Sequence, residues 1–364
     1  MRVLYDGIVF QNSYQRGIQR AFRELISHMP EGIRAVVALT GAPKCPLPQR
    51  ATIARLGVPG TSLLPRALRT PLQSRFGARG VRRLAANADV FHSTYFTLAP
   101  ADLPSVLHVH DLLPEQFPEC FDAPWAAREI QTRADAIERA TRVVAISDAT
   151  ARQIARFYPL AIQKTTTIHW GCNHLARHDG VPKSYANTPY VLHVGDRAGY
   201  KNFSVILDAM ESPRWPRELG LTIVGPEWRE SELSRVDRLC KDHVVRHLGR
   251  ASDQSLAALY ASTRCLIAPS LGEGFGFPIL EAQTLCAPVV CADTPVFREI
   301  AGDAALFFDP RDPSQLLDRV LAIGQIAARA RAAERARWNL TRFSWERCAA
   351  RTAELYADAL SAAR

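Results

Sequence analysis

The sequence lacks the features that would place it in several special classes of protein. No segment approaches the roughly 18 consecutive apolar residues that a membrane-spanning helix requires, so an integral membrane protein is excluded. The N-terminus, MRVLYDGIVF, has a strand-like run directly after Met1 instead of the basic region, apolar stretch and cleavage site of a secretory signal. No internal repeat or low-complexity tract is present. We therefore expect a globular protein of the cytoplasm.

Metal-binding and disulfide patterns are also missing. The eight cysteines form no CxxC pair, and several lie in apolar runs, such as Cys265 in STRCLIAPS. We expect reduced and mostly buried thiols, with no structural metal site.

Acidic residues are absent from a long stretch of the first half. No acid occurs between Glu31 and Asp89, and residues 1–180 hold 22 Lys and Arg against 14 Asp and Glu, a net +8. Residues 181–364 hold 23 against 22, a net +1. Such a field suits anionic lipid headgroups, a pyrophosphate-linked molecule or nucleic acid. A solvated face of an Arg-rich protein explains it equally well, because 40 of the 45 basic residues are Arg.

The length and the apolar pattern indicate two α/β domains. At about 150 residues per domain, 364 residues leave room for two. Short apolar runs alternate with helical patterns, which favours parallel sheets built from βαβ units. We expect strands near 2–5, 34–39, 89–91, 105–109, 142–146, 165–168, 190–194, 221–225, 244–249, 265–269 and 288–292. We expect helices near 15–28, 124–140, 148–157, 202–210, 312–337 and 343–360. The polar stretch 172–189, with no apolar periodicity, is the linker candidate.

The segment SLGEGFGFPILEA, residues 270–282, is the most informative in the chain. Three glycines follow a buried strand and precede a helix that should begin at Phe277–Pro278. Exposed backbone N–H groups at a helix N-terminus bind phosphate or the polar edge of a sugar. Glu273 and Glu281 are eight residues apart, and carboxylates pair well with vicinal hydroxyls. A glycine turn with a capping glutamate is the structural alternative.

Two further segments place polar side chains at strand ends, where ligands bind open α/β sheets. In HVGDRAGYKNF (193–203), Arg197 and Lys201 lie in the loop after a strand, and two cations facing the glycine loop would neutralise a nucleotide diphosphate. In HVHDLLPEQFP (108–118), His110 and Asp111 follow another strand, with Asp111 as a candidate to orient the imidazole.

The segment EGFGFPILE resembles the E-x-F-G-x-x-x-x-E pattern of retaining GT-B glycosyltransferases of family four, also called glycosyl transferases group 1. The matching residues are Glu273, Phe275, Gly276 and Glu281. The resemblance implies a GT-B fold: an acceptor-binding Rossmann-like domain over 1–172 and a donor-binding one over 187–342, facing across a cleft. It also implies that the helix over 343–364 crosses back to the first domain.

The resemblance implies roles for individual residues. Those that would act in catalysis are His110, which contacts the donor sugar, Arg197 and Lys201 on the diphosphate, and Glu273 on hexose hydroxyls. Those that would bind the donor are Gly17, Gly195, Gly274, Phe275, Gly276 and Glu281, the last on the ribose. At Gly17 this chain departs from its relatives, which often carry two adjacent glycines where Arg16 and Gly17 stand here. His92, Ser93 and Tyr95 end a strand and are acceptor candidates, although core packing explains Tyr95 equally well.

The resemblance is strongest to bacterial mannosyltransferase-like members, through GDRAGYKNF and FHSTYFTLAP. It implies transfer with retention of configuration, with no metal or other cofactor, from a nucleotide sugar for which GDP-mannose is the first guess. The acceptor would be a glycan or a polyprenyl-pyrophosphate-linked saccharide in O-antigen or exopolysaccharide assembly. The Arg-rich residues 66–84 would then lie on the cytoplasmic face of the inner membrane.

Four other classes stay open or are disfavoured. A nucleotide-sugar epimerase shares the GT-B architecture but lacks the E-x-F-G-x-x-x-x-E helix, and a phosphorylase needs a cofactor lysine and a longer chain. A basic nucleic-acid-binding or membrane-binding protein fits the charge, but no recognition helix or stacking motif accompanies the arginines. A dinucleotide oxidoreductase is disfavoured because no G-x-G-x-x-G follows the first strand.

Overall fold

The structure is a computed structural model, and it describes residues 1–11, 16–56, 77–100, 102–172, 175, 189–324 and 326–363. Two compact units make up the chain. The first unit contains Met1–Gly171 together with Trp345–Arg364, and the second unit contains Cys172–Ser344. These limits lie within two residues of the sequence-based ends at 172 and 342. The expected linker over 172–189 lies almost entirely outside the described residues.

In the first unit, the described residues form a seven-stranded sheet of order β3-β2-β1-β4-β5-β6-β7, in which each neighbouring pair is parallel. The strands are β1 (Arg2–Tyr5), β2 (Arg34–Leu39), β3 (Ala51–Arg55), β4 (Val90–Ser93), β5 (Ser105–Val109), β6 (Arg142–Ala145) and β7 (Thr165–Thr167). The central strands are buried along their whole length, as expected for a parallel sheet covered by helices on both faces. Strand β3 was not predicted, because this edge strand is only partly buried and carries no apolar run.

Four helices of the first unit, α1, α4, α5 and α13, match the expected ranges to within about two residues, whereas the helical segment over 77–85 and α3 were not expected. The bounds are α1 (Arg16–Ser27), α3 (Leu113–Gln116), α4 (Ala123–Arg139), α5 (Asp148–Phe157), a helical segment over 77–85, the 3₁₀ segments η1 (Ile8–Gln11), η3 (Pro118–Cys120) and η4 (Pro159–Lys164), and α13 (Trp345–Ala362). Helix α5 begins where Ser147 caps it, by accepting a 3.0 Å hydrogen bond from the backbone N–H of Thr150.

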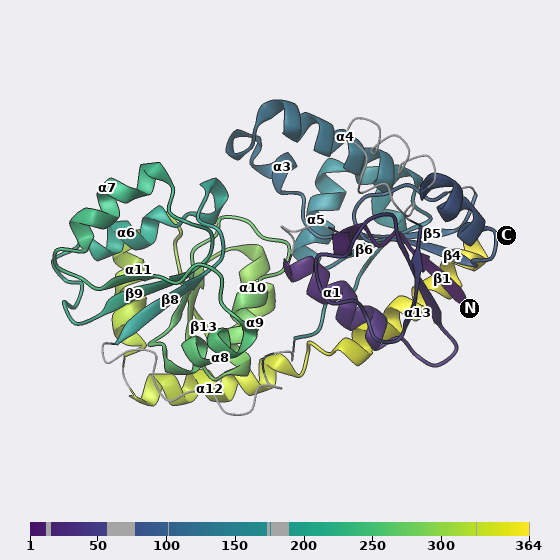
Figure 1. Cartoon of the computed structure of the whole chain (residues 1–364). Helices are drawn as coiled ribbons and strands as arrows, with labels where there is room; N and C mark the ends of the chain where they lie inside the picture. The colour runs from purple at the N-terminus through teal and green to yellow at the C-terminus, as the bar shows by residue number, and fades with distance from the viewer. Residues whose placement is uncertain are drawn as a thin grey trace. The chain divides into compact units, whose positions relative to one another are not determined.

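The C-terminal helix α13 belongs to the first unit, although the second unit separates it from the rest in sequence. It packs beside α1, as Figure 1 shows in yellow and purple. Its apolar side is buried, with Trp345 at 1% and Tyr356 at 0% exposure. The hydroxyl oxygens of Tyr356 and Tyr5 on β1 are 2.7 Å apart. The helix is therefore part of the core of this unit.

In the second unit, the described residues form a six-stranded parallel sheet of order β10-β9-β8-β11-β12-β13. The strands are β8 (Tyr190–Val194), β9 (Gly220–Val224), β10 (Val245–His247), β11 (Leu266–Ala268), β12 (Val289–Ala292) and β13 (Ala305–Phe308). Renumbered within the unit, this is the 3-2-1-4-5-6 order of a Rossmann fold.

Helices cover both faces of the second sheet (Figure 1). The bounds are α6 (Ser204–Met210), α7 (Glu230–Leu239), α8 (Asp253–Ser262), α9 (Phe277–Thr284), α10 (Pro295–Ala301), α11 (Pro313–Ala322) and α12 (Ile326–Leu340), with 3₁₀ segments η6 (Gly199–Lys201) and η7 (Gly302–Ala304). The single helix predicted over 312–337 is wrong. Two helices stand there, and the turn between them contains Gly324, a residue that weakens a helix interior.

Each sheet has its own topological switch point, at the corresponding pair of strands. In the first unit, β1 pairs with β4, and in the second, β8 pairs with β11. At these places the connections run off in opposite directions, so the loops at the carboxyl ends of the two strands lie side by side. Ligands bind open α/β sheets at this position.

Two sequence-based expectations concern the membrane and the thiols. Across the described residues, no helix is both long and apolar enough to span a bilayer. All eight cysteines are free, and four of them are buried: Cys172, Cys265, Cys291 and Cys348. Residues 57–76, which include most of the proposed membrane segment over 66–84, lie outside the described residues.

Candidate functional site

The candidate site of the second unit is the switch point between β8 and β11. The β8 loop ends in η6, which supplies Lys201, and the β11 loop is the glycine segment before α9. The backbone N–H of Leu271 donates a 2.7 Å hydrogen bond to the carbonyl oxygen of Tyr200, so the loops are joined directly. Asn202, at φ 52°, donates a side-chain hydrogen bond of 3.2 Å to the Pro269 carbonyl. The two motifs predicted from sequence are therefore neighbours.

Lys201 and Glu273 form an ion pair where these loops meet. The Lys201 ammonium donates a 2.6 Å hydrogen bond to Oε1 of Glu273, and the Ser270 hydroxyl donates to the same oxygen at 2.9 Å. The side chains of Lys201 and Glu273 are 19% and 21% exposed. Both charges are thus ordered by protein contacts and remain accessible to a ligand.

The glycine loop leads into a helix N-terminus, as predicted. Helix α9 begins at Phe277 with Pro278 in its first turn, and Gly276 precedes it at φ 104°. A side chain at Gly276 would be strained at this φ and would bring its Cβ to 3.1 Å from the ring of Phe297. Phe275 is buried, with its ring 5.8 Å from that of Phe343. These contacts fix the direction in which the first N–H groups of α9 point.

Glu281 lies in α9 and is 5% exposed. One oxygen of its carboxylate, Oε2, accepts a 2.9 Å hydrogen bond from the hydroxyl of Tyr260 on α8. A buried carboxylate is retained only with such donors, because desolvation penalises its charge. Tyr260 is a contributor to the site that the sequence analysis did not identify, since it lies 21 residues before Glu281 on another helix.

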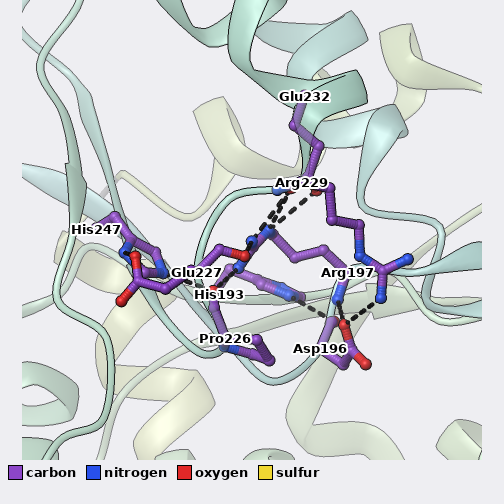
Figure 2. A network of polar contacts seen from close by, with 8 residues as sticks. All are labelled: His193, Asp196, Arg197, Pro226, Glu227, Arg229, Glu232 and His247. Atoms are coloured by element: carbon purple, nitrogen blue, oxygen red, sulfur yellow. Dashed lines mark hydrogen bonds and ion pairs between the residues drawn. The ribbon is translucent and has the colours of Figure 1, made fainter.

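Arg197 departs from the prediction that it faces the glycine loop beside Lys201. Its side chain is 1% exposed, and its Nε lies 3.0 Å from Oε1 of Glu232 on α7. The guanidinium also donates to the carbonyl oxygens of Pro226 at 2.8 Å and Glu227 at 2.7 Å (Figure 2). The expectation of two cations facing that loop is therefore wrong for Arg197, which ties the β8 loop to the β9 loop and α7.

Aromatic and charged neighbours complete this network. The Arg197 guanidinium carbon lies 4.7 Å from the ring centroid of Trp228, within the range of a cation–π contact. Asp196 accepts a 2.6 Å hydrogen bond from the Arg197 backbone N–H and a 3.0 Å one from Arg229 (Figure 2). Glu232 also accepts from the backbone N–H of Arg229 at 2.8 Å. Glu232 was missed from sequence because nothing in its spacing marks it as the partner of Arg197.

Gly195 follows β8 with φ 141°, a conformation that favours glycine. Its carbonyl oxygen would lie 2.2 Å from a Cβ placed on Gly225, so the β8 and β9 loops approach too closely for a side chain there. Gly195 therefore ends β8 where two loops pass close to each other, and Gly274 is a buried residue of the glycine loop.

His110 follows β5 in the first unit and is 3% exposed. Its Nε2 lies 3.1 Å from the carbonyl oxygen of Thr94, so Nε2 carries the proton and donates it. Burial lowers the pKa of His110 to about 4, which keeps the ring neutral at pH 7. The imidazole is enclosed by aromatic rings, including Trp170 at 5.4 Å between centroids.

Asp111 was expected to orient the His110 imidazole, but among the described residues it forms no hydrogen bond with either ring nitrogen of His110. Its carboxylate lies 3.2 Å from Nη1 of Arg133, a 5% exposed side chain on α4. Arg133 also meets Glu115 at 3.4 Å and Glu129 at 3.4 Å. Asp111 therefore anchors α3 and α4 through Arg133.

The other candidates of the first unit are placed as follows. Gly17 is an exposed residue in the first turn of α1, and most of the loop before it lies outside the described residues. His92 is wholly buried and Ser93 is 2% exposed, so neither presents a surface to an acceptor. The Tyr95 hydroxyl donates to Glu129 at 3.1 Å. At the β1–β4 switch point, Asp6 accepts a 3.0 Å hydrogen bond from the Thr94 backbone N–H, a contact that the sequence analysis missed.

Comparison with known proteins accounts for most of the chain. The family model described as Glycosyltransferase Family 4 matches residues 15–174, and that described as Glycosyl transferases group 1 matches residues 177–337. Together with the two Rossmann-like sheets and the site in the second unit, these matches define a glycosyltransferase. The chain belongs to the GT-B glycosyltransferases of family 4. The epimerase and nucleic-acid-binding alternatives are not favoured.

Curated relatives and a solved structure agree with this assignment. The O-antigen chain mannosyltransferase B of Escherichia coli is 27% identical over 288 residues, which cover 73% of this chain and 74% of that protein. The serotype-specific mannosyltransferase WbdA of Escherichia coli is 31% identical over 246 residues, 58% of this chain and 29% of that protein. This chain thus spans under a third of WbdA. HepE of Anabaena, solved with UDP and glucose, has a TM-score of 0.72 at 19% identity, covering 98% of this chain and 100% of that one.

Proposed function

We propose that this glycosyltransferase moves a hexose, with mannose from GDP-mannose as the first donor, to a saccharide or lipid-linked acceptor in O-antigen or exopolysaccharide assembly. Mannosyltransferases of O-antigen chains among the relatives support the sugar and the pathway. The Lys201–Glu273 ion pair at the β8–β11 switch point is the observation that carries the proposal, because it sets a cation and a carboxylate beside a helix N-terminus.

In this proposal the diphosphate of the donor replaces Glu273 as the ion-pair partner of Lys201. The ammonium then neutralises the phosphate oxygens, and the N–H groups at the start of α9, near Gly274 and Gly276, add the positive end of the helix dipole. The released Glu273 carboxylate accepts hydrogen bonds from hexose hydroxyls. Glu281, held by Tyr260, binds the ribose hydroxyls. The contact between Lys201 and Glu273 is thus replaced by a contact of Lys201 with the diphosphate and a contact of Glu273 with the hexose.

We propose a new role for Arg197 and keep the expected role of His110. We propose that Arg197 positions the β8 loop through Glu232, since its guanidinium already holds two carbonyl oxygens and a carboxylate. His110 keeps the sugar-contacting role that the family resemblance assigns to it. Its ring is 3% exposed, so this role requires the aromatic side chains around it, such as Trp170, to move aside when the sugar binds.

The remaining parts of the proposal concern stereochemistry, metal and membrane. We propose transfer with retention, in which the leaving phosphate oxygen accepts the proton of the acceptor hydroxyl, so that no protein base is needed. Lys201 and the α9 N–H groups would do what a divalent cation does for the diphosphate in other enzymes. The basic first unit would meet the pyrophosphate of the acceptor or an anionic bilayer.

A ligand panel tests the donor site directly. A ligand that binds only the folded protein raises its melting temperature according to concentration and affinity. We expect GDP-mannose and GDP to raise the melting temperature of the wild type, and Lys201→Ala to remove most of that increase. With an acceptor saccharide, NMR of the product's anomeric carbon then determines retention or inversion. Failure of every nucleoside diphosphate sugar to bind the wild type would contradict the proposal.

A further inference from the structure

Three buried histidines stand in a row in the first unit. His92 on β4, His108 on β5 and His110 just after β5 are 0%, 0% and 3% exposed. The ring centroids of His92 and His108 are 4.8 Å apart with an interplanar angle of 14°, and those of His108 and His110 are 6.4 Å apart at 22°. We refer to these three residues as the histidine column. The ring of Phe22 on α1 packs edge-on against all three.

A hydrogen-bond chain enters this column from the C-terminal helix. The Tyr5 and Tyr356 hydroxyl oxygens are 2.7 Å apart, and the Tyr356 hydroxyl lies 2.6 Å from Nδ1 of His92. Nε2 of His92 lies 2.7 Å from Nδ1 of His108. The chain therefore connects β1, α13, β4 and β5 through side chains that are buried from bulk solvent.

The protons of this chain have one favoured direction. Burial lowers the pKa of His92 to about 3 and that of His108 well below its usual range, so each ring is neutral and carries one N–H. If Tyr5 donates to Tyr356 and Tyr356 to His92, then His92 donates through Nε2 to His108, and every hydroxyl proton has an acceptor. In the opposite direction, the Tyr5 hydroxyl proton has no acceptor among the described residues. Among the described protein groups alone, each direction leaves one buried donor without an acceptor: the Nε2–H of His108 in the first direction and the Tyr5 hydroxyl in the second. A water at His108 Nε2 would accept the first of these protons, so the first direction is favoured once such a water is present.

This direction determines the state of His108 at the end of the chain. Because its Nδ1 accepts from His92, the proton of His108 is on Nε2, a buried atom with no hydrogen-bond partner among the described residues. On the neighbouring ring, Nε2 of His110 donates to Thr94, which leaves Nδ1 as a buried lone pair, also unpartnered in the described part of the chain. One N–H and one lone pair on adjacent rings are thus both unsatisfied.

We propose that Tyr356 is a positioning residue for His110: it fixes His108 as the Nε2–H tautomer, and one ordered water accepts from His108 Nε2 and donates to His110 Nδ1. Buried waters occupy sites where polar groups otherwise lack partners, and this water has two. It completes the chain from α13 to His110 and restrains the orientation of the His110 ring. The functional consequence rests on the proposed function, in which His110 contacts the transferred sugar.

The tautomers are measurable in the free protein, independently of any ligand. Long-range ¹H–¹⁵N NMR of histidine-labelled protein distinguishes Nδ1–H from Nε2–H rings. We expect His92, His108 and His110 all to be neutral Nε2–H tautomers at pH 7. In Tyr356→Phe, which keeps the ring but loses the donor to His92, we expect His92 and His108 to become mixtures of tautomers.

Tyr5→Phe is the matched control, because it also removes one buried hydroxyl from the same chain. Tyr356 can still donate to His92 in this variant, so we expect the tautomers of the wild type. A single unchanged Nε2–H form of His108 in Tyr356→Phe overturns the proposal, as does a wild-type His108 protonated at Nδ1. A crystal structure at high resolution that shows no water between His108 Nε2 and His110 Nδ1 overturns the bridge.

The effect on ligands separates this inference from the proposed function. The loss of one hydrogen bond in the chain should weaken GDP-mannose binding by Tyr356→Phe about 3- to 10-fold and leave GDP binding unchanged, because only the sugar reaches His110. Equal weakening of both ligands contradicts the positioning role. If the wild type binds neither ligand, the proposed function fails, whereas the NMR experiment still decides whether the column has the order we infer.

Discussion

The Lys201 ammonium donates a 2.6 Å hydrogen bond to the Glu273 carboxylate, although the two residues are 72 positions apart in the chain. The topology of the sheet brings them together, because β8 and β11 are neighbours at the switch point. Each side chain holds the other in an accessible position before any ligand is bound. The ion pair is itself worth little, since exposed pairs contribute about 0–1 kcal/mol to stability. Its importance is in the placement of the charges.

Replacement of Lys201 should therefore affect catalysis far more than folding. We expect Lys201→Ala to lower kcat about 100-fold, the size of effect seen when a group that stabilises developing charge is removed. The free energy of unfolding should change by less than about 1 kcal/mol. Lys241→Ala, at an exposed residue of the same unit, is the control and should retain wild-type kcat. A Lys201→Ala variant with kcat within threefold of wild type, roughly 0.6 kcal/mol, would remove the ammonium from the mechanism.

The contribution of the Tyr260 hydroxyl to donor binding should be measurable. Tyr260→Phe removes the 2.9 Å hydrogen bond to Glu281 and keeps the ring. Hydrogen bonds to a charged group contribute about 1.5–3 kcal/mol, so we expect the KM for the donor to rise about tenfold or more with a smaller change in kcat. Glu281→Ala should raise it further. Tyr190→Phe loses a comparable 2.9 Å hydrogen bond to the Leu259 carbonyl and should leave KM unchanged.

Arg197 and Glu232 should behave as one structural unit in a double-mutant cycle. Breaking a buried ion pair by removing one partner costs about 3–5 kcal/mol, so Arg197→Met and Glu232→Gln should each destabilise the second unit by about that amount. The double variant should lose much less than the sum, with a coupling of about 1–3 kcal/mol. Arg197→Lys should not restore stability, because an ammonium cannot reach Glu232 and two carbonyl oxygens together. Urea denaturation measures all four states, and additive losses would contradict the pairing.

The sequence predicted those parts of the fold and site that depend on neighbouring residues. Ser147 caps α5, and α9 begins at Phe277 with Pro278 in its first turn, because caps and proline positions are local properties. The glycine segment was placed correctly between a strand and a helix for the same reason. The break at Gly324 was missed because the Leu-rich residues before it and the Ala- and Arg-rich residues after it all favour helix.

Partners that lie far apart in sequence were not predictable in this way. Glu232 and Arg197 are 35 positions apart, and Tyr356 and His92 are 264 apart. No periodicity relates such residues, because their contact is set by the order of strands and the return of α13 to the first unit. The prediction for the orientation of Arg197 was wrong for this reason. Its position in the loop could be predicted from the sequence, but its pairing with the Glu232 carboxylate on α7 could not.

The last prediction concerns stability in acid. Burial lowers the pKa of His92 to about 3 and those of His110 and His193 to about 4, and it lowers that of His108 well below its usual value. In the unfolded chain these rings take up protons near pH 6.5. Between about pH 4 and 6.5 the unfolded state thus binds more protons than the folded state, so stability falls as the pH is lowered. Asp6 acts in the opposite sense, because burial raises its pKa and the folded state retains that proton.

Each proton that is taken up on unfolding changes the free energy of unfolding by about 1.4 kcal/mol per pH unit. Four histidines, opposed by Asp6 and by Glu115, whose pKa is also raised by burial, should give a net uptake of about two protons on unfolding near pH 5. At about 2.8 kcal/mol per pH unit below pH 6.5, a protein with about 5–7 kcal/mol of stability at neutral pH would then unfold between about pH 4 and 5. Urea denaturation from pH 7.5 to 4.5 gives the slope directly. His193→Asn, which removes one buried ring from the second unit, should reduce it by about one proton, whereas a slope below one proton in the wild type means that these imidazoles are hydrated or charged in the folded state.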